Sequence, residues 1–219
     1  MKTVAIVDYG MCNLFSVHHA CCSVGLNAII TSDKKQLLCA GAMILPGVGA
    51  FGEAMVNLRI LDLIEPIKDF IASGRKFMGI CLGMQLLLSE SEEFGRHKGL
   101  NVIEGTVKKF QGHTDIRIKV PQIGWNQIFP ASEDSWTASP LRGLKSGEFM
   151  YFIHSYYVEP SDIKVVLSHT KYHSTEYCSS LLRNNVFAAQ YHPEKSGMKG
   201  LNIYRNWALS IKKQNGENL

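Results

Sequence analysis

The chain has 219 residues, a length that fits one α/β domain or two small ones. Hydrophobic residues make up 46% of it and charged residues 19%, so an ordinary soluble core is expected, and no run of eighteen apolar residues suggests a membrane span. The net charge of +4, with His neutral, is a mild excess that no long Lys/Arg cluster carries, which argues against nucleic-acid binding.

The first half of the chain alternates strand and helix signals. A β-rich run at 3–9 opens it, and the helix that follows can be capped by Asn13 and ended by Gly25. Further strands are expected at 28–31, 42–45 and 75–80, and two further helices at 61–73 and 82–89. Pro66 can kink or divide the first of these helices. This β-α-β-α order predicts a mostly parallel sheet flanked by helices, in which function gathers at the carboxyl ends of strands.

From about residue 102 to 190 the sequence changes to many short β-rich runs. We expect strands at 107–110, 116–120, 124–129, 149–158, 163–169, 175–183 and 186–191, followed by a closing helix at 197–212. Asn184-Asn185 is typical of a hairpin turn between the last two strands. With no internal repeat and no low-complexity linker, the simplest account is one domain over 1–219, with an antiparallel section added to the parallel sheet.

The number and spacing of the cysteines indicate the redox state of the cellular compartment. The six cysteines, at positions 12, 21, 22, 39, 81 and 178, show neither CxxC pairing nor disulfide-framework spacing. They fit a reducing cytoplasm, with most of them acting as small buried residues. The first nine residues fit a first strand better than a signal peptide. We therefore expect a cytoplasmic protein with no metal or cofactor.

One strand-to-helix junction carries the most informative pattern, Gly79-Ile80-Cys81-Leu82-Gly83. It matches a nucleophile elbow with Cys in place of Ser. So sharp a turn strains the backbone of the nucleophile, and the two glycines remove clashes with neighbouring side chains. The turn would place the sulfur at a helix N-terminus, which favours thiolate, and would aim the Leu82 N–H at a reacting carbonyl. A lone cysteine is more often a buried apolar residue, but this context favours a nucleophile.

A thiol nucleophile needs a base, and eight histidines compete for that role. His192-Pro193-Glu194 directly follows a predicted apolar strand. An extended His-x-Glu places both side chains on one side, so the carboxylate can bond one imidazole nitrogen and leave the other facing a sulfur. His154 is the rival, but it lies within an aromatic strand and is interpreted as structural. The other six histidines have no carboxylate in a suggestive arrangement.

These residues resemble the class I (triad) glutamine amidotransferases, which have the elbow Cys early and His-Pro-Glu late. Within that class, the sequence is similar to the glutaminase subunits of imidazole glycerol phosphate synthase. Blocks from one end of the chain to the other carry this resemblance: Asp8-Tyr9-Gly10 with Asn13-Leu14 and Ser16-Val17, Leu45-Pro46-Gly47-Val48-Gly49-Ala50-Phe51, the elbow through Leu87, Gly124-Trp125-Asn126, Tyr151-Phe152-Ile153-His154-Ser155-Tyr156, and Gln190 through Ser196.

The resemblance implies roles for individual residues. Cys81 would attack the carboxamide of L-glutamine to form a γ-glutamyl thioester, His192 would carry the proton to the leaving ammonia, and Glu194 would orient His192. An oxyanion hole would use backbone N–H groups of Val48 or Gly49 together with that of Leu82. Substrate contacts would come from Gln85, Glu93, Ser155 and Tyr156. The plainer alternatives for these positions are a strand-ending turn at 46–49, a solvated helix Gln85, and a solvated acidic face at 90–93.

A partner is implied as well, because free ammonia is protonated at neutral pH and no second domain for an acceptor is visible in the sequence. By resemblance the partner is a (β/α)8-barrel cyclase, which would make a heterodimer and receive the ammonia inside the complex. The resemblance places Asn13, Trp125, Tyr151 and Lys195 near that interface. It also implies that the isolated subunit is nearly silent until the synthase binds its own substrate.

One departure leaves the partner open, because relatives often carry Gly where Cys12 stands, near the expected partner face. The alternative within the same chemistry is a paralogous glutaminase subunit that supplies ammonia for amidino groups on surface sugars. A regulatory protein that has lost its chemistry is disfavoured by the intact Cys81, His192 and Glu194. A cysteine hydrolase acting on peptides or aldehydes is also disfavoured. In such elbow-Cys proteins the His follows the Cys closely in sequence, whereas here His192 comes more than a hundred residues after Cys81.

Overall fold

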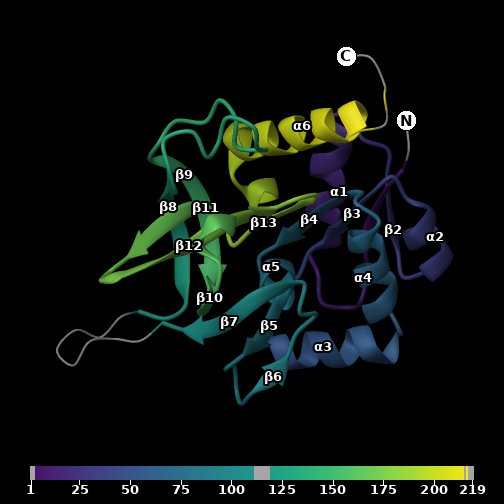
Figure 1. The fold of residues 1–219 in the computed structure, drawn as a ribbon, viewed down its shortest axis with the longest axis horizontal. Helices are drawn as coiled ribbons and strands as arrows, with labels where there is room; N and C mark the ends of the chain where they lie inside the picture. The colour runs from purple at the N-terminus through teal and green to yellow at the C-terminus, as the bar shows by residue number, and fades with distance from the viewer. Residues whose placement is uncertain (1–2, 111–118, 215, 217–219) are drawn as a thin grey trace.

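The computed structural model describes residues 3–110, 119–214 and 216. Within this part of the chain, thirteen strands join one mixed sheet, with the order β2-β1-β3-β4-β13-β12-β10-β7-β5-β6 and with β11, β8 and β9 branching from β12. Figure 1 shows α6 along one side of this sheet and α3 and α4 along the other. The predicted α/β class, mostly parallel at its centre with an antiparallel addition, is confirmed.

The amino-terminal half builds the parallel centre of the sheet. Its strands are β1 (Val4–Val7), β2 (Ala28–Thr31), β3 (Ala42–Leu45) and β4 (Lys76–Ile80), and its helices are α1 (Leu14–Ser23), α2 (Lys34–Cys39), α3 (Phe51–Ile60), α4 (Ile64–Ala72) and α5 (Leu82–Leu86). Strands β1, β2, β3 and β4 pair in parallel, and β13 (Val186–Ala189) joins β4 in parallel from the far end of the chain. The ends of β4 and β13 therefore meet at one edge, although their residues are more than a hundred positions apart.

The carboxyl-terminal half adds the antiparallel section and two terminal elements. Its strands are β5 (Leu88–Ser91), β6 (His97–Lys98), β7 (Ile103–Lys109), β8 (Gln122–Pro130), β9 (Glu148–His154), β10 (Tyr156–Pro160), β11 (Val166–Tyr172) and β12 (Thr175–Arg183). The short helix η1 (Ile163–Val165) precedes β11, while η2 (Pro193–Lys195) and α6 (Gly197–Gln214) follow β13. Strands β8 and β9 form a twisted ribbon that stands away from the parallel centre (Figure 1).

Two apolar cores cover the two faces of the sheet because side chains alternate along each strand. Ala5 and Val7 of β1 face one core, which helices α3 and α4 close with Phe51 and Phe70. Ile6 faces the other core, which α1 and α6 close. Every residue of β1, β3 and β13 is buried, as expected for central strands covered by helices on both sides.

Several element predictions are confirmed. The strands at 28–31, 42–45 and 175–183 have the predicted bounds, and Asn13 caps α1 by accepting a bond from the Ser16 N–H. The hairpin at Asn184-Asn185 joins β12 to β13, with Asn184 at φ 55°.

Other element predictions need correction. Helices α2 and α3 were not expected, and the predicted helix at 61–73 begins only at Ile64, so that Pro66 falls in the first turn, where it breaks nothing. The predicted helix at 82–89 ends at Leu86, because Leu88 already belongs to strand β5. The strand at 149–158 is divided at Ser155, and the one at 116–120 lies mostly outside the described residues.

Candidate active site

The junction of β4 and α5 forms a strained elbow at Cys81. Its backbone has φ 53° and ψ −110°, a conformation that L-residues rarely adopt. Glycine is required on the helix side, because a Cβ on Gly83 would lie 1.8 Å from the Leu45 carbonyl oxygen. A Cβ on Gly79 would lie 3.1 Å from the Ala188 Cβ. The glycines therefore let the turn sit tightly on β3 and β13, with the sulfur at the sheet edge.

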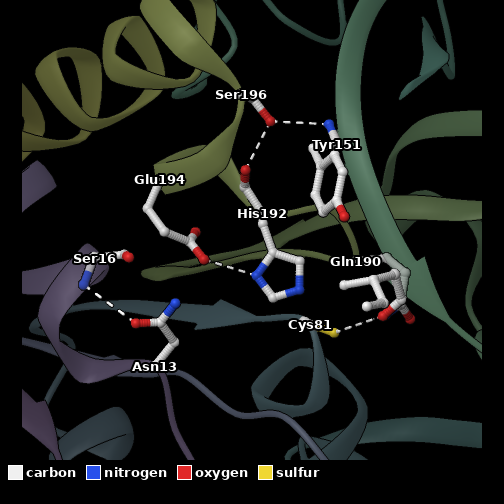
Figure 2. Close-up of polar contacts among 9 residues, drawn as sticks. Asn13, Ser16, Cys81, Tyr151, Gln190, His192, Glu194 and Ser196 are labelled. Atoms are coloured by element: carbon white, nitrogen blue, oxygen red, sulfur yellow. Dashed lines mark hydrogen bonds and ion pairs between the residues drawn. The ribbon is translucent and has the colours of Figure 1, made fainter. Parts of the chain in front are cut away.

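The segment that follows the carboxyl end of β13 supplies a paired imidazole and carboxylate. The Nδ1 atom of His192 lies 2.7 Å from a Glu194 carboxylate oxygen, and the two side chains are only 3% and 1% exposed. The other ring nitrogen, Nε2, has no hydrogen-bond partner among the described residues, and Figure 2 shows it on the side of Cys81. Burial lowers the pKa of His192, but the facing Cys81 sulfur, when ionised, and Glu194 outweigh burial and raise that pKa to about 10.

Ser196 fixes the backbone that carries this pair. Its hydroxyl donates to the His192 carbonyl at 2.7 Å and accepts from the Tyr151 N–H at 3.0 Å (Figure 2). The His192 N–H in turn donates to the Tyr151 carbonyl at 2.9 Å. The start of α6 is thus tied to β9, and the imidazole is held against the β8–β9 ribbon.

A cavity of about 260 Å³ opens beside the sulfur. All four residues predicted to contact a substrate line it, and the full lining is Val48, Gly49, Cys81, Leu82, Gln85, Glu93, Pro121, Ile153, His154, Ser155 and Tyr156. The Glu93 carboxylate accepts from the Phe51 N–H at 2.6 Å, and burial raises its pKa. Gln85 points inward, and its amide nitrogen donates to the Tyr156 carbonyl at 2.9 Å. The acidic 90–93 run is therefore not a solvated face throughout, since Glu93 is buried.

Two of the three predicted oxyanion donors, the Val48 and Leu82 N–H groups, are engaged within the chain in this structure. The Val48 N–H donates to the Met11 carbonyl at 2.8 Å, and the Leu82 N–H donates to the Gly47 carbonyl at 3.4 Å. The Tyr9 hydroxyl and the Cys12 thiol both donate to the Pro46 carbonyl, at 2.9 and 3.3 Å. An oxyanion hole at 46–49 would therefore require these peptides to turn.

The four residues expected at a partner face lie around the same edge. The Trp125 and Tyr151 rings meet edge to face with centroids 6.1 Å apart, and the Lys195 Nζ lies 6.0 Å from the Tyr151 centroid. Trp125 is 56% exposed. Asn13 caps α1, which packs against η2, the element that carries Glu194.

One residue beside the sulfur was not identified as a site residue from the sequence, whereas His154 was considered and interpreted as structural. Gln190 is fully buried, and its amide nitrogen lies 3.6 Å from the Cys81 sulfur. Its position at the end of the predicted strand 186–191, two residues before His192 and hence on the same side if the segment is extended, is a signal that could have found it. His154 lines the cavity as a buried neutral residue, because burial lowers its pKa to about 4.

The rest of the described chain offers no second centre of this kind. A larger cavity of about 470 Å³ lies at the opposite end of β4, lined by Lys76, Asn185 and Trp207, and contains none of the elbow residues. Over the described ranges, no group of three or more His, Cys, Asp or Glu side chains is arranged to hold a metal ion. No helix in the described part of the chain is both long and apolar enough to cross a membrane.

Sequence comparisons find relatives over nearly the whole chain. A family model described as "Glutamine amidotransferase class-I" matches residues 5–211. The chain is 47% identical over 208 residues to "Imidazole glycerol phosphate synthase subunit HisH" of Syntrophotalea carbinolica, covering 93% of this chain and 98% of that protein. It is 44% identical over 214 residues to the protein of the same name in Aquifex aeolicus, covering 97% and 99%.

Structural comparisons show the same fold at low identity. PurLQS from Thermotoga maritima matches with a TM-score of 0.70 at 19% identity, over 97% of this chain and 100% of that chain. The glutaminase domain of CTPS from Trypanosoma brucei matches with a TM-score of 0.62 at 16% identity, over 100% of this chain and 96% of that chain.

Proposed function

The chain belongs to the class-I glutamine amidotransferase family, and from this membership we propose that it is the glutaminase subunit of imidazole glycerol phosphate synthase, acting in histidine biosynthesis. The observation that carries the proposal is the strained Cys81 elbow facing the His192–Glu194 pair beside a cavity. The relatives at 44–47% identity, matched over nearly their whole length, support the choice of this subunit.

In the proposed reaction the Cys81 thiol gives its proton to His192, and the resulting thiolate attacks the carboxamide carbon of L-glutamine and forms a carbon–sulfur bond. The His192 imidazolium gives its Nε2 proton to the departing nitrogen as the carbon–nitrogen bond breaks, which leaves ammonia and a γ-glutamyl thioester. Neutral His192 then accepts a proton from water, whose oxygen attacks the thioester carbon; the carbon–sulfur bond breaks, which releases glutamate and restores the Cys81 thiolate beside the His192 imidazolium. Glu194 holds the imidazole in one orientation through Nδ1 at 2.7 Å.

The substrate fits the cavity in chemical terms. Glu93 would face the α-amino group of glutamine, while backbone and hydroxyl groups of Ser155 and Tyr156 would bind its polar end. Gln85 uses both amide hydrogens within the chain, toward the Tyr156 carbonyl and Gln190, so its substrate contact would fall to its carbonyl oxygen. The oxyanion would form once the Val48 or Gly49 peptide turns to join the Leu82 N–H.

We infer a (β/α)8-barrel cyclase as the partner subunit, docked over the same edge. The outward side of the β8–β9 ribbon is apolar, with Ile123, Trp125, Phe149 and Ile153 between 38% and 57% exposed. These positions alternate along both strands. Ile123 pairs with Ile153 across the ribbon, while Trp125 pairs with Tyr151 and Phe149 with Gln127, so the four lie on one face, which we call the ribbon face. Exposed aromatic anchors of this kind are typical of protein interfaces. A cytoplasmic location and a heterodimer follow from the same proposal.

The paralogous glutaminase for amidino-sugar synthesis is not favoured, because the relatives at 44–47% identity carry the histidine-pathway name. Cys12 remains the departure from the family pattern. Its thiol is partly buried against the Pro46 carbonyl, so it acts on the loop at 46–49 from within the chain.

The test is glutamate release by the purified chain, alone and with the cyclase subunit carrying its own substrate. We expect strong stimulation by the complete complex, and loss of at least about a thousandfold in Cys81→Ala, the order seen when a nucleophile is removed. Cys39→Ala serves as the control thiol variant, because Cys39 is exposed at the end of α2, and it should retain the chemistry. Stimulation by an amidino-sugar synthase alone would contradict the pathway, and activity that survives Cys81→Ala would contradict the nucleophile.

A further inference from the structure

The Cys81 sulfur has two polar neighbours besides His192. Its distance to the Ile153 carbonyl oxygen is 3.8 Å, and its distance to the Gln190 amide nitrogen is 3.6 Å. The carbonyl can accept a bond only from the protonated thiol, whereas the amide donates and so favours the ionised sulfur. Gln190 is fully buried and Cys81 is 6% exposed, so water is a poor substitute for either neighbour.

The orientation of the Gln190 amide follows from its second contact. The Gln85 nitrogen donates to the Tyr156 carbonyl at 2.9 Å, which identifies that end of the Gln85 amide as the nitrogen. The same nitrogen lies 3.0 Å from Gln190, and two amide nitrogens would repel each other there. Gln190 must therefore turn its oxygen to Gln85, which leaves its N–H groups toward the sulfur.

We propose that the Gln190 side-chain amide is the hydrogen-bond donor that stabilises the Cys81 thiolate, and that Gln85 is the positioning residue that orients this amide. The inference rests on the proposed role of Cys81 as nucleophile and adds a catalytic residue to it. A donor to an anion in a buried site is more effective than one in water, because the local dielectric is low. Replacing it by an apolar side chain would leave His192 as the main stabilising group.

The other titratable groups around the sulfur are few and can be named. His192 faces it from the segment after β13, with Glu194 behind, and Tyr9, in the loop after β1, lies close enough to sense its charge. Glu93 and His154 line the same cavity. None of these side chains bonds to the Gln190 amide, so a substitution there changes the sulfur's environment without removing an ionisable group.

The experiment measures alkylation of Cys81 by iodoacetamide as a function of pH, with the Cys81 peptide quantified by mass spectrometry in the full chain. The exposed Cys22 and Cys39 are internal references. For Gln190→Leu we expect the midpoint of the Cys81 profile to rise by roughly one pH unit, so that alkylation below the midpoint slows about tenfold. Gln190→Glu should shift it further, because a carboxylate would then face the thiolate.

Ser179→Ala is the matched control. Ser179 is equally buried, and its carbonyl accepts from the Gln190 N–H at 2.9 Å, but its hydroxyl bonds to Ser168 rather than to the sulfur. Its profile should coincide with that of the wild type. Gln85→Leu provides a second variant if Gln190→Leu does not fold, and it should shift the profile in the same direction by a smaller amount.

Two results would overturn the inference in distinguishable ways. Identical profiles for wild type, Gln190→Leu and Gln85→Leu would remove the donor role while leaving Cys81 as the nucleophile. A wild-type Cys81 with the same pH profile as Cys22 and Cys39 would instead remove the activated nucleophile, and the proposed thiolate donor with it.

Discussion

His192 is held between two acidic groups, and its protonation depends on both. Burial lowers its pKa, but the ionised Cys81 sulfur and Glu194 raise it from 6.5 to about 10. A pKa that is raised in the folded state means that the charged imidazole favours folding. This contribution to the free energy of unfolding is complete below about pH 6.5 and is lost as the pH rises toward 10.

The corresponding prediction concerns the titration of His192, followed by NMR of its ring protons. In wild type the imidazole should stay protonated well above pH 7. In Cys81→Ala its pKa should fall, because burial then opposes Glu194 alone. His154, which is already neutral, is the internal reference. A His192 titration unaffected by Cys81→Ala would show that the sulfur is not ionised beside it.

Residues differ in how far the sequence reveals them. Cys81, His192 and Glu194 lie in short local patterns, so spacing alone predicts which side of the chain each one faces. Gln190 and Ser196 act through contacts with residues more than 40 positions away, namely Cys81 and Tyr151, and local spacing does not encode these. The same holds for the loop at 46–49, whose peptides are bonded to Met11 and Leu82 through the fold.

At the scale of elements, the elbow depends on how closely α5 approaches β3. Gly83→Ala would place a Cβ 1.8 Å from the Leu45 carbonyl oxygen, so helix or strand must move. We expect a loss of about 3 kcal/mol in the free energy of unfolding, at the upper end for overpacked cores, together with strongly reduced glutamate release. Urea unfolding followed by circular dichroism measures the first effect.

Gly74→Ala is a useful comparison for that variant. Gly74 ends α4 with φ +79°, and a Cβ there would meet nothing within 4 Å. The Gly74→Ala substitution should lower the free energy of unfolding only by the strain of a left-handed residue, on the order of 1 kcal/mol, and activity should be retained. Equal effects of the two substitutions would mean that close packing at the elbow is not what Gly83 provides.

A helix or strand could be predicted where the residues within it determine its type and its bounds. β12 and the α1 cap agree with the sequence because alternation and Asn13 act locally. Helix α3 was missed because Ala50 offers no side-chain cap and Gly52 stands in the first turn, so no start signal exists. The end of α5 was misplaced because an unbroken apolar run fits a buried helix and a buried strand equally well, and pairing of Leu88 with Ile103 decides the matter.

At the scale of the whole molecule, the ribbon face adjoins the cavity beside Cys81. Ile153 lines the cavity and is itself 38% exposed on this face, so a partner docked there would cover the opening beside Cys81. Such an arrangement suits a subunit whose product must not reach solvent. It also places Lys195, next to Glu194, over the Tyr151 ring at the rim of the same surface.

The last prediction tests this surface by association with the proposed barrel subunit. Trp125→Ala removes its largest exposed anchor, and loss of a central aromatic contact costs about 2 kcal/mol, or roughly a thirtyfold rise in Kd. Ile60→Ala is the control, since Ile60 is 75% exposed and is the last residue of α3, a helix that lies apart from β8 and β9 in Figure 1. Calorimetric titration should separate the two variants, while Cys81 alkylation in the isolated chain stays unchanged in both. Equal binding by both variants would place the partner elsewhere, because an apolar surface that carries the interface cannot lose its main anchor without effect.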